Sequence, residues 1–227
     1  MGITLGDIRT GSRRRARATV CSTVTEYTGL WGWAVAPGTR LVRGDECSCG
    51  DERCAAPGRH PLAGAGEVGP GSTADEVAAL WERFPGASAL LPAGRSFDVL
   101  EVSEAAGCRA MVRLERMGTR LGPVLATPEG RAQFFVAPGA AAELSGLLYK
   151  MGWDDAGLDL RPLGLGDHVT APPSELGGLG PVRWLRPPTL DTAVHPPEAR
   201  LVLGTLAYAC HRDRRPLAGS GSWLVPS

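Results

Sequence analysis

The chain has 227 residues, enough for one domain or one domain of two lobes, and its 24 basic side chains balance 24 acidic ones. This balance excludes a global electrostatic attraction to nucleic acid or membrane, so any contact with a polyanion must come from a local patch. No stretch approaches the ~20 apolar residues of a membrane span, and no apolar signal core follows the N-terminal charges, so we expect no membrane contact and a cytoplasmic location.

The N-terminal part is predicted to be irregular. Residues 1–22 are polar and basic without hydrophobic period, which predicts a flexible tail. Its arginines, Arg13, Arg14, Arg15 and Arg17, either contact phosphate or are simply solvated. The apolar run LWGWAV over 30–35 then predicts a buried strand that ends in a turn at Pro37 and Gly38.

The next segment, CSCGDERCAAPGRHP, lies in a turn-rich loop over 44–62 and is the first chemical signal. Three thiols and one imidazole, from Cys47, Cys49, Cys54 and His60, can close a tetrahedron around a structural zinc ion. Reduced thiols without metal are the alternative, and a disulfide is disfavoured in a cytoplasmic chain. The other three cysteines stand alone, which is typical of packed side chains.

The rest of the chain alternates helix and strand patterns. Ser72 or Thr73 caps a helix that Pro85 and Gly86 end. Cys108 to Met117, Ala140 to Met151 and Pro197 to His211 have helical spacing, whereas strands are expected at 89–92, 97–102, 133–136 and, as a pair, within 159–173. Interleaved elements without an internal repeat predict a mixed α/β or α+β fold.

The strand in FDVLEVSEAAG is the second chemical signal. Because successive side chains of a strand alternate between its faces, Glu101 and Ser103 share one face and Asp98 lies on the other. Two-metal nucleotidyl transfer needs carboxylates gathered around ions about 4 Å apart. Here the strand supplies one carboxylate and one hydroxyl, so from this strand alone an ordinary solvated glutamate is the favoured interpretation.

Several motifs together resemble one family. YTGLWGWAVAPG, the cysteine loop ending in PGRHP, STADEVAALWERFPGASALLPAGRSFDVLEVSEAAG and LDLRPLGLGDHVTAPPSELGGLG occur in the order of bifunctional DNA primase/polymerase (prim-pol) domains of the archaeo-eukaryotic primase superfamily. The resemblance covers about 27–188. It implies an α+β fold in which a palm resembling an RNA-recognition domain packs on a smaller αβ lobe. It also implies template-directed joining of nucleoside triphosphates with Mg²⁺ or Mn²⁺.

The family's functional positions are only partly matched. Its paired metal-binding acids correspond to Glu101 and Ser103, its third acid to Asp159, and its histidine to Gln133. Arg131 and Arg161 are nearby candidates for phosphate contacts. Loss of one member of such a set typically costs about two to four orders of magnitude in rate. We therefore expect weak or absent polymerase activity.

The resemblance also frames the domain organisation and the partners. We expect a basic tail over 1–22, a prim-pol-like domain over 23–190 and a C-terminal helix with a flexible tail over 191–227. An active enzyme with an altered metal set, a non-catalytic module that binds nucleotides or single-stranded nucleic acid, and a partner-docking protein are the open alternatives. DNA or nucleotides, and a separate helicase or replication or repair protein, are the expected partners.

Overall fold

The computed structural model describes the chain except for residues 1–4, 43–45, 154–156 and 215–227, and the side chains of 5–13 are not described either. The flexible tail predicted at the end of the 191–227 segment, GSGSWLVPS, therefore lies outside the described residues. The elements are α1 (Leu5–Gly29), β1 (Ala36–Gly38), α2 (Ala74–Arg83), β2 (Ser88–Pro92), β3 (Asp98–Ser103), α3 (Glu104–Arg116), β4 (Val124–Thr127), β5 (Arg131–Val136), α4 (Ala140–Lys150), β6 (Leu160–Leu163), β7 (His168–Ala171), β8 (Glu175–Leu176), β9 (Gly180–Pro181), β10 (Arg183–Arg186), α5 (Leu190–Val194) and α6 (Ala199–Arg214).

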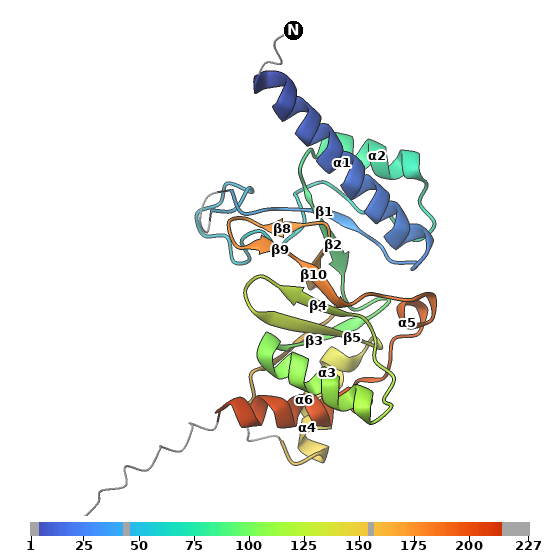
Figure 1. Cartoon of the computed structure of the whole chain (residues 1–227), viewed down its shortest axis with the longest axis vertical. Helices are drawn as coiled ribbons and strands as arrows, with labels where there is room; N and C mark the ends of the chain where they lie inside the picture. The colour runs from blue at the N-terminus through green and yellow to red at the C-terminus, as the bar shows by residue number, and fades with distance from the viewer. Residues whose placement is uncertain (1–4, 43–45, 154–156, 215–227) are drawn as a thin grey trace, which may run out of the picture.

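The larger sheet is antiparallel and has the strand order β10-β4-β5-β3-β6. One face is covered by α3, α4 and α6, against which Leu100, Val102 and Phe134 are buried (Figure 1). Helix α3 approaches this face closely because Gly107 has no side chain: a Cβ there would lie 2.4 Å from the Cβ of Ala132. The helices thus cover one face of the sheet and leave Glu101 on the other.

The smaller sheet has the order β1-β2-β7 and lies with α1 and α2 at the other end of the molecule (Figure 1). An aromatic cluster joins the two sheets, since the rings of Trp33 and Phe135 stack with centroids 5.5 Å apart and Phe97 contacts both. The Glu101 face of the large sheet is therefore turned toward the smaller lobe. The mixed α+β class predicted from the sequence is confirmed.

Three local predictions differ from the structure. Helix α1 occupies Leu5–Gly29, where a flexible tail was predicted through residue 22. The run over 30–35 is not a full strand: only Val35 pairs, with Val68, and β1 begins at Ala36. The expected strand pair within 159–173 is divided, because β6 joins the large sheet and β7 the small one.

Other local predictions hold. Thr73 caps α2 through a capping box, in which its side chain accepts from the Glu76 N–H and the Glu76 side chain accepts from the Thr73 N–H. The division of the chain into a tail, a domain over 23–190 and a C-terminal segment stays a prediction. None of the described helices is both long and apolar enough to cross a membrane.

Candidate functional site

The acid positions lie on the face of β3 opposite the helices, where strand register brings polar side chains together. Glu101 pairs across the sheet with Gln133 of β5 and with Arg161 of β6. Ser103 pairs with Arg131 at the end of β5. Because cross-strand partners share a face, these side chains gather in one patch.

Glu101 is buried, with 4% of its surface exposed, and its carboxylate is fully engaged. The Gln133 amide donates to Oε2 at 2.7 Å. Two guanidinium groups, from Arg131 and Arg161, lie 3.4 and 3.3 Å from Oε1. A carboxylate removed from water needs such partners, because an isolated buried charge is strongly unfavourable.

Asp159, immediately before β6, is held by the same arginine. Arg131 donates to both of its carboxylate oxygens, at 2.7 and 2.8 Å. This bidentate pair lowers the pKa of Asp159 and raises that of Arg131. The structure thus brings Glu101, Gln133 and Asp159 together, but Arg131 lies between the two acids.

Ser103 has a structural role that the sequence analysis did not assign. Its hydroxyl accepts from the Ala106 N–H at 3.2 Å and so caps the start of α3. The same hydroxyl donates to the carboxylate of Asp213 in α6 at 3.4 Å, and Arg109 forms an ion pair with Asp213. Asp213 could not be predicted from the sequence, because only the packing of α6 on α3 brings it to β3.

Asp98 lies on the opposite face, as strand alternation predicts. It is buried and accepts from the Ala141 N–H at 2.8 Å, at the start of α4. A carboxylate is favourable there because the first N–H groups of a helix have no intrahelical acceptor. Asp98 therefore stabilises the start of α4 and does not replace the acid missing at Ser103.

The acids do not form a metal cage as they stand. Among the described side chains, the group with ligand atoms all within 4.8 Å of one another is Cys47, Cys49, Cys54 and His60. Mg²⁺ and Mn²⁺ prefer several oxygen ligands in a near-octahedral shell. At β3 such an ion would have to displace arginines that already neutralise Glu101 and Asp159, so the residues present do not fit it in this arrangement.

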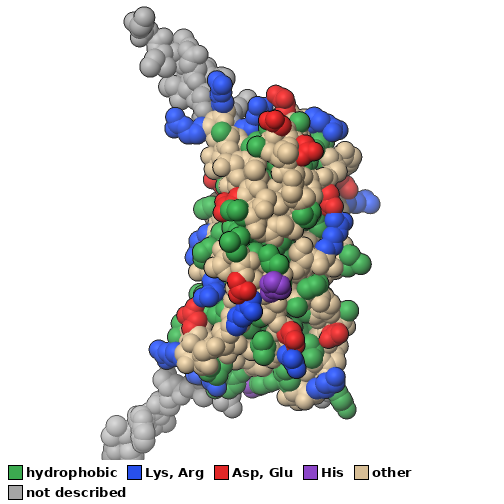
Figure 2. Space-filling model, turned by 90° about the vertical axis from the view of Figure 1, so that its right-hand side faces the viewer, with side chains coloured by type: hydrophobic (Ala, Val, Ile, Leu, Met, Phe, Trp, Pro, Cys, Tyr) green, Lys and Arg blue, Asp and Glu red, His purple; other side chains and the backbone are tan. Residues whose placement is uncertain are grey.

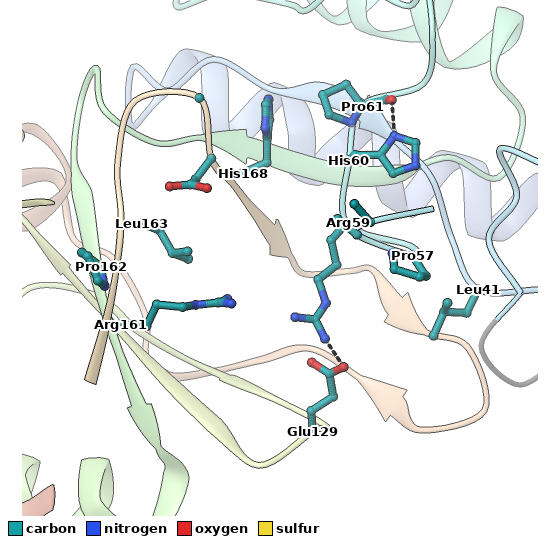
Figure 3. A pocket seen from close by; sticks show the side chains of 14 residues that line it. Leu41, Pro57, Arg59, His60, Pro61, Glu129, Arg161, Pro162, Leu163 and His168 are labelled. Carbon is teal, nitrogen blue, oxygen red and sulfur yellow. Dashed lines mark hydrogen bonds and ion pairs between the residues drawn. The ribbon is translucent and has the colours of Figure 1, made fainter. Parts of the chain in front are cut away.

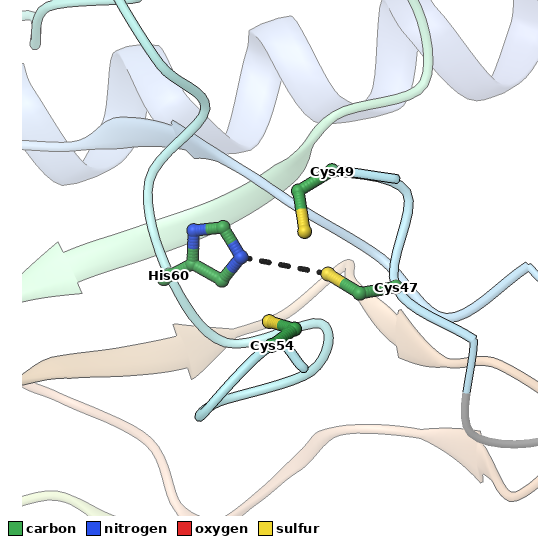
Figure 4. Close-up of side chains that lie close together, drawn as sticks. All are labelled: Cys47, Cys49, Cys54 and His60. Carbon is green, nitrogen blue, oxygen red and sulfur yellow. Dashed lines mark hydrogen bonds between the residues drawn. The ribbon is translucent and has the colours of Figure 1, made fainter. Parts of the chain in front are cut away.

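The cysteine loop, by contrast, has converging ligands, as the sequence predicts (Figure 4). Nε2 of His60 lies 3.5 Å from Sγ of Cys47. Nδ1 of His60 lies 3.0 Å from the Pro61 carbonyl oxygen, which can only accept, so the proton is on Nδ1 and Nε2 is free to ligate. The ligand types and their convergence fit a structural zinc ion.

The charge state of Cys47 also suits a metal ligand. Burial opposes ionisation of this thiol, but hydrogen bonds with the backbone of Gly58 and Cys49 and with the side chains of Thr39 and Cys49 together lower the pKa of Cys47 to about 6. The thiolate, which is the form that binds metal, is therefore available at neutral pH.

A family model covers most of this architecture. The model for the N-terminal domain of bifunctional DNA primase/polymerase, Prim-Pol, matches residues 24–199, well over half of the chain. The chain belongs to the Prim-Pol family. Comparisons with curated proteins and with solved structures gave no match. The matched Prim-Pol residues include β3, Gln133, Asp159 and the cysteine loop, whereas Asp213 lies beyond them.

The Prim-Pol domain has a cavity of about 590 Å³ between the cysteine loop and the large sheet (Figure 3). Arg161 lines it from β6, His168 from β7, and Arg59 from the loop, where it forms an ion pair with Glu129. Burial lowers the pKa of His168, so its imidazole is neutral at pH 7. A volume of this size is typical of sites for small ligands.

Proposed function

We propose that this Prim-Pol domain binds nucleotides or single-stranded nucleic acid, and that its nucleotidyl-transfer chemistry is weak or lost. The observation that carries the proposal is the position of Arg131, whose guanidinium contacts both Glu101 and Asp159. An arginine thus stands between the acids to which the family's metal ions would bind. Ser103 and Gln133, at the positions of the second acid and the histidine, support the same conclusion.

A metal ion that binds Glu101 must first displace Arg131 and Arg161 from its carboxylate. A metal that displaces these partners replaces hydrogen bonds to a charged group, each of which contributes about 1.5–3 kcal/mol, although the Arg131 and Arg161 side chains are 24% and 57% exposed and can be solvated. Since about 1.4 kcal/mol is a factor of ten, the metal is weakened by roughly one to two orders of magnitude. Asp159 is more easily freed, because its side chain is 56% exposed. One weakly held ion is therefore the most that this set supports.

The binding part of the proposal rests on the cavity. Arg161 and Arg59 provide positive charge at its wall, and each is already paired with one carboxylate, Glu101 and Glu129 respectively. A phosphate group competes for such exposed guanidinium groups with bidentate geometry. The cysteine loop, with a structural zinc ion bound, would fix the wall that carries Arg59. The large sheet would serve as the palm of an RNA-recognition type.

Primer extension with Mn²⁺ and all nucleotides tests the proposal. We compare the wild-type chain, Glu101→Ala, and the double variant Ser103→Asp, Gln133→His. Aspartate is also a good N-cap, so the first change keeps the cap of α3. We expect no extension by the wild-type chain, and measurable extension only when the double variant is combined with Arg131→Gln, because Arg131 otherwise stays between Glu101 and Asp159. Wild-type extension that Glu101→Ala abolishes would contradict the loss of chemistry.

Nucleotide binding is measured separately by calorimetric titration with a deoxynucleoside triphosphate. Arg161→Gln should weaken binding about tenfold, because it removes one phosphate contact worth roughly 1–2 kcal/mol. The matched control is Arg186→Gln, which removes a half-buried arginine of β10 that does not line the cavity. Equal affinities of the two variants would contradict the placement of the nucleotide in this cavity.

A further inference from the structure

Helix α1 carries a basic surface that the candidate site does not use. Five arginines and no acidic residue occur between Ile8 and Thr25, in a chain whose total charge is balanced. Residues 14–19 are all exposed, although they are helical. Figure 1 shows that this half of α1 runs past α2, away from the sheets, and Figure 2 shows basic side chains at that end of the molecule beside acidic ones.

The packing of α1 explains which half is free. Val24 and Tyr27 are buried and hold the C-terminal half of the helix in the aromatic core. Toward the N-terminus the described contacts end with an ion pair of 3.5 Å between Arg17 and Glu82, in which both side chains are well exposed. Exposed pairs of this kind contribute about 0–1 kcal/mol, so Glu82 holds Arg17 only weakly.

The composition of the exposed half indicates the class of partner. The segment Arg14 to Thr19, RRARAT, has no apolar side chain larger than alanine. A helix that lies on a lipid surface, or in a groove of a protein partner, needs an apolar face. This segment has none, whereas arginine is well suited to phosphate. A phosphate polymer therefore fits it better than a membrane or a protein does.

The spacing of the arginines favours a duplex. At about 100° per residue, Arg15 and Arg17 are separated by about 160° around the helix axis, with Arg14 between them. The major groove of B-form DNA is about 12 Å wide and admits one helix between two phosphate strands. With Arg14 toward the groove floor, the other two arginines face opposite walls. Phosphate contact would also relieve the repulsion between neighbouring arginines, which destabilises an isolated helix.

We infer that the exposed half of α1, with Arg14, Arg15 and Arg17, is a second nucleic-acid site that binds duplex DNA by its backbone, remote from the sheet face that carries Glu101. The inference rests on the proposed function only in the class of ligand. Through this site the domain binds the duplex whether or not a nucleotide occupies the cavity.

The test is fluorescence anisotropy with a short labelled DNA duplex, at salt concentrations between about 50 and 200 mM. The variant is Arg14→Gln, Arg15→Gln, Arg17→Gln in the full chain, and the matched control is Arg113→Gln, Arg116→Gln, Arg212→Gln, which removes the same charge from the exposed surfaces of α3 and α6. Glutamine keeps good helix propensity, and circular dichroism verifies that α1 persists.

We expect the α1 variant to lose about tenfold or more in affinity and to flatten the salt dependence by roughly two to three ion equivalents. The control should change affinity about twofold or less. The inference would be overturned by equal losses of affinity in the two variants, or by binding to anionic vesicles in place of DNA. It would also be overturned by equal affinity for an RNA duplex, because the major groove of RNA is too narrow for a helix.

The two proposals fail separately. Primer extension by the wild-type chain would overturn the loss of chemistry and leave the α1 site standing. An unchanged DNA affinity of the α1 variant would overturn the α1 site, while nucleotide binding in the cavity is measured independently with Arg161→Gln.

Discussion

The cysteine loop and the acid cluster on β3 both present candidate metal ligands, but their surroundings are opposite. In the loop, the ligand atoms of three thiols and of His60 all lie within 4.8 Å of one another, and no ion pair is described among them. On β3, Glu101 and Asp159 are each paired with arginine. Burial and the neighbouring Cys47 and Cys49 raise the pKa of Cys54 to about 11, so this thiol gives up its proton only when a cation binds, whereas the paired carboxylates are already neutralised. Ligand identity alone thus does not define a metal site, because the partners of the ligands decide whether a cation is needed.

Removal of one candidate zinc ligand from the cysteine loop should have the largest effect. A zinc ion on the four ligands would hold together a segment with few regular elements, and structural zinc contributes about 10 kcal/mol or more to folding in small zinc domains, so Cys47→Ser should lose this contribution. We expect loss of one zinc per chain by elemental analysis and a large fall in the melting temperature.

Cys108→Ser is the matched control, because Cys108 is exposed on α3 and far in sequence from the cluster. It should retain zinc and the wild-type melting temperature. If the wild-type chain is purified without zinc and is insensitive to chelators, the cysteine loop does not bind a structural zinc ion.

Arg131→Gln should leave the carboxylates of Glu101 and Asp159 with fewer cationic partners, so that they resemble the unpaired ligands of the cysteine loop. Glu101 keeps Arg161 and Gln133 but loses one cationic partner, so we expect a destabilisation of about 2–3 kcal/mol, somewhat below the loss for a fully broken buried pair. The freed acids should then bind Mn²⁺ more tightly than the wild-type chain does, as measured by calorimetric titration.

The control for this change is Arg183→Gln, which breaks the exposed pair with Glu104 and should cost about 1 kcal/mol or less. If the wild-type chain already binds Mn²⁺ as tightly as Arg131→Gln does, the arginines do not exclude metal and the two regions differ less than their geometry indicates.

Sequence periodicity was sufficient for those parts of the site that lie within one element. Alternation along β3 correctly separates Asp98 from Glu101, and the close spacing of the cysteine ligands already confines them to one loop. The partners of the acids were not predictable in this way. Arg131 was expected to contact phosphate, yet it reaches Asp159 only because β5 and β6 flank β3.

Long-range packing and weak local signals account for the other differences. Asp213 reaches Ser103 across 110 positions of the chain, through the packing of α6 on α3. Helix α1 was missed because its basic half has no apolar stripe, and helix patterns are recognised by that stripe. Strands β6 and β7 lie in different sheets because each pairs with a strand that is distant in sequence, β3 for β6 and β2 for β7.

The smallest expected effect concerns pH. Arg131 holds the pKa of Asp159 below its ordinary value near 4, so the stabilisation from this pair is complete above that pH and is lost as the pH falls through the lower pKa of the folded state. Because the Asp159 side chain is about half exposed, solvent screening limits the contribution to about 1 kcal/mol or less. Thermal unfolding should therefore show a difference in melting temperature between the wild-type chain and Asp159→Asn at pH 7 that narrows below pH 4.

The control is Glu175→Gln, which changes an exposed acid without a described ion pair and should show no such difference. A difference for Asp159→Asn that does not change with pH would mean that its carboxylate acts through packing, and the contrast between a neutralised acid cluster and a metal-requiring cysteine loop would then rest on Glu101 alone.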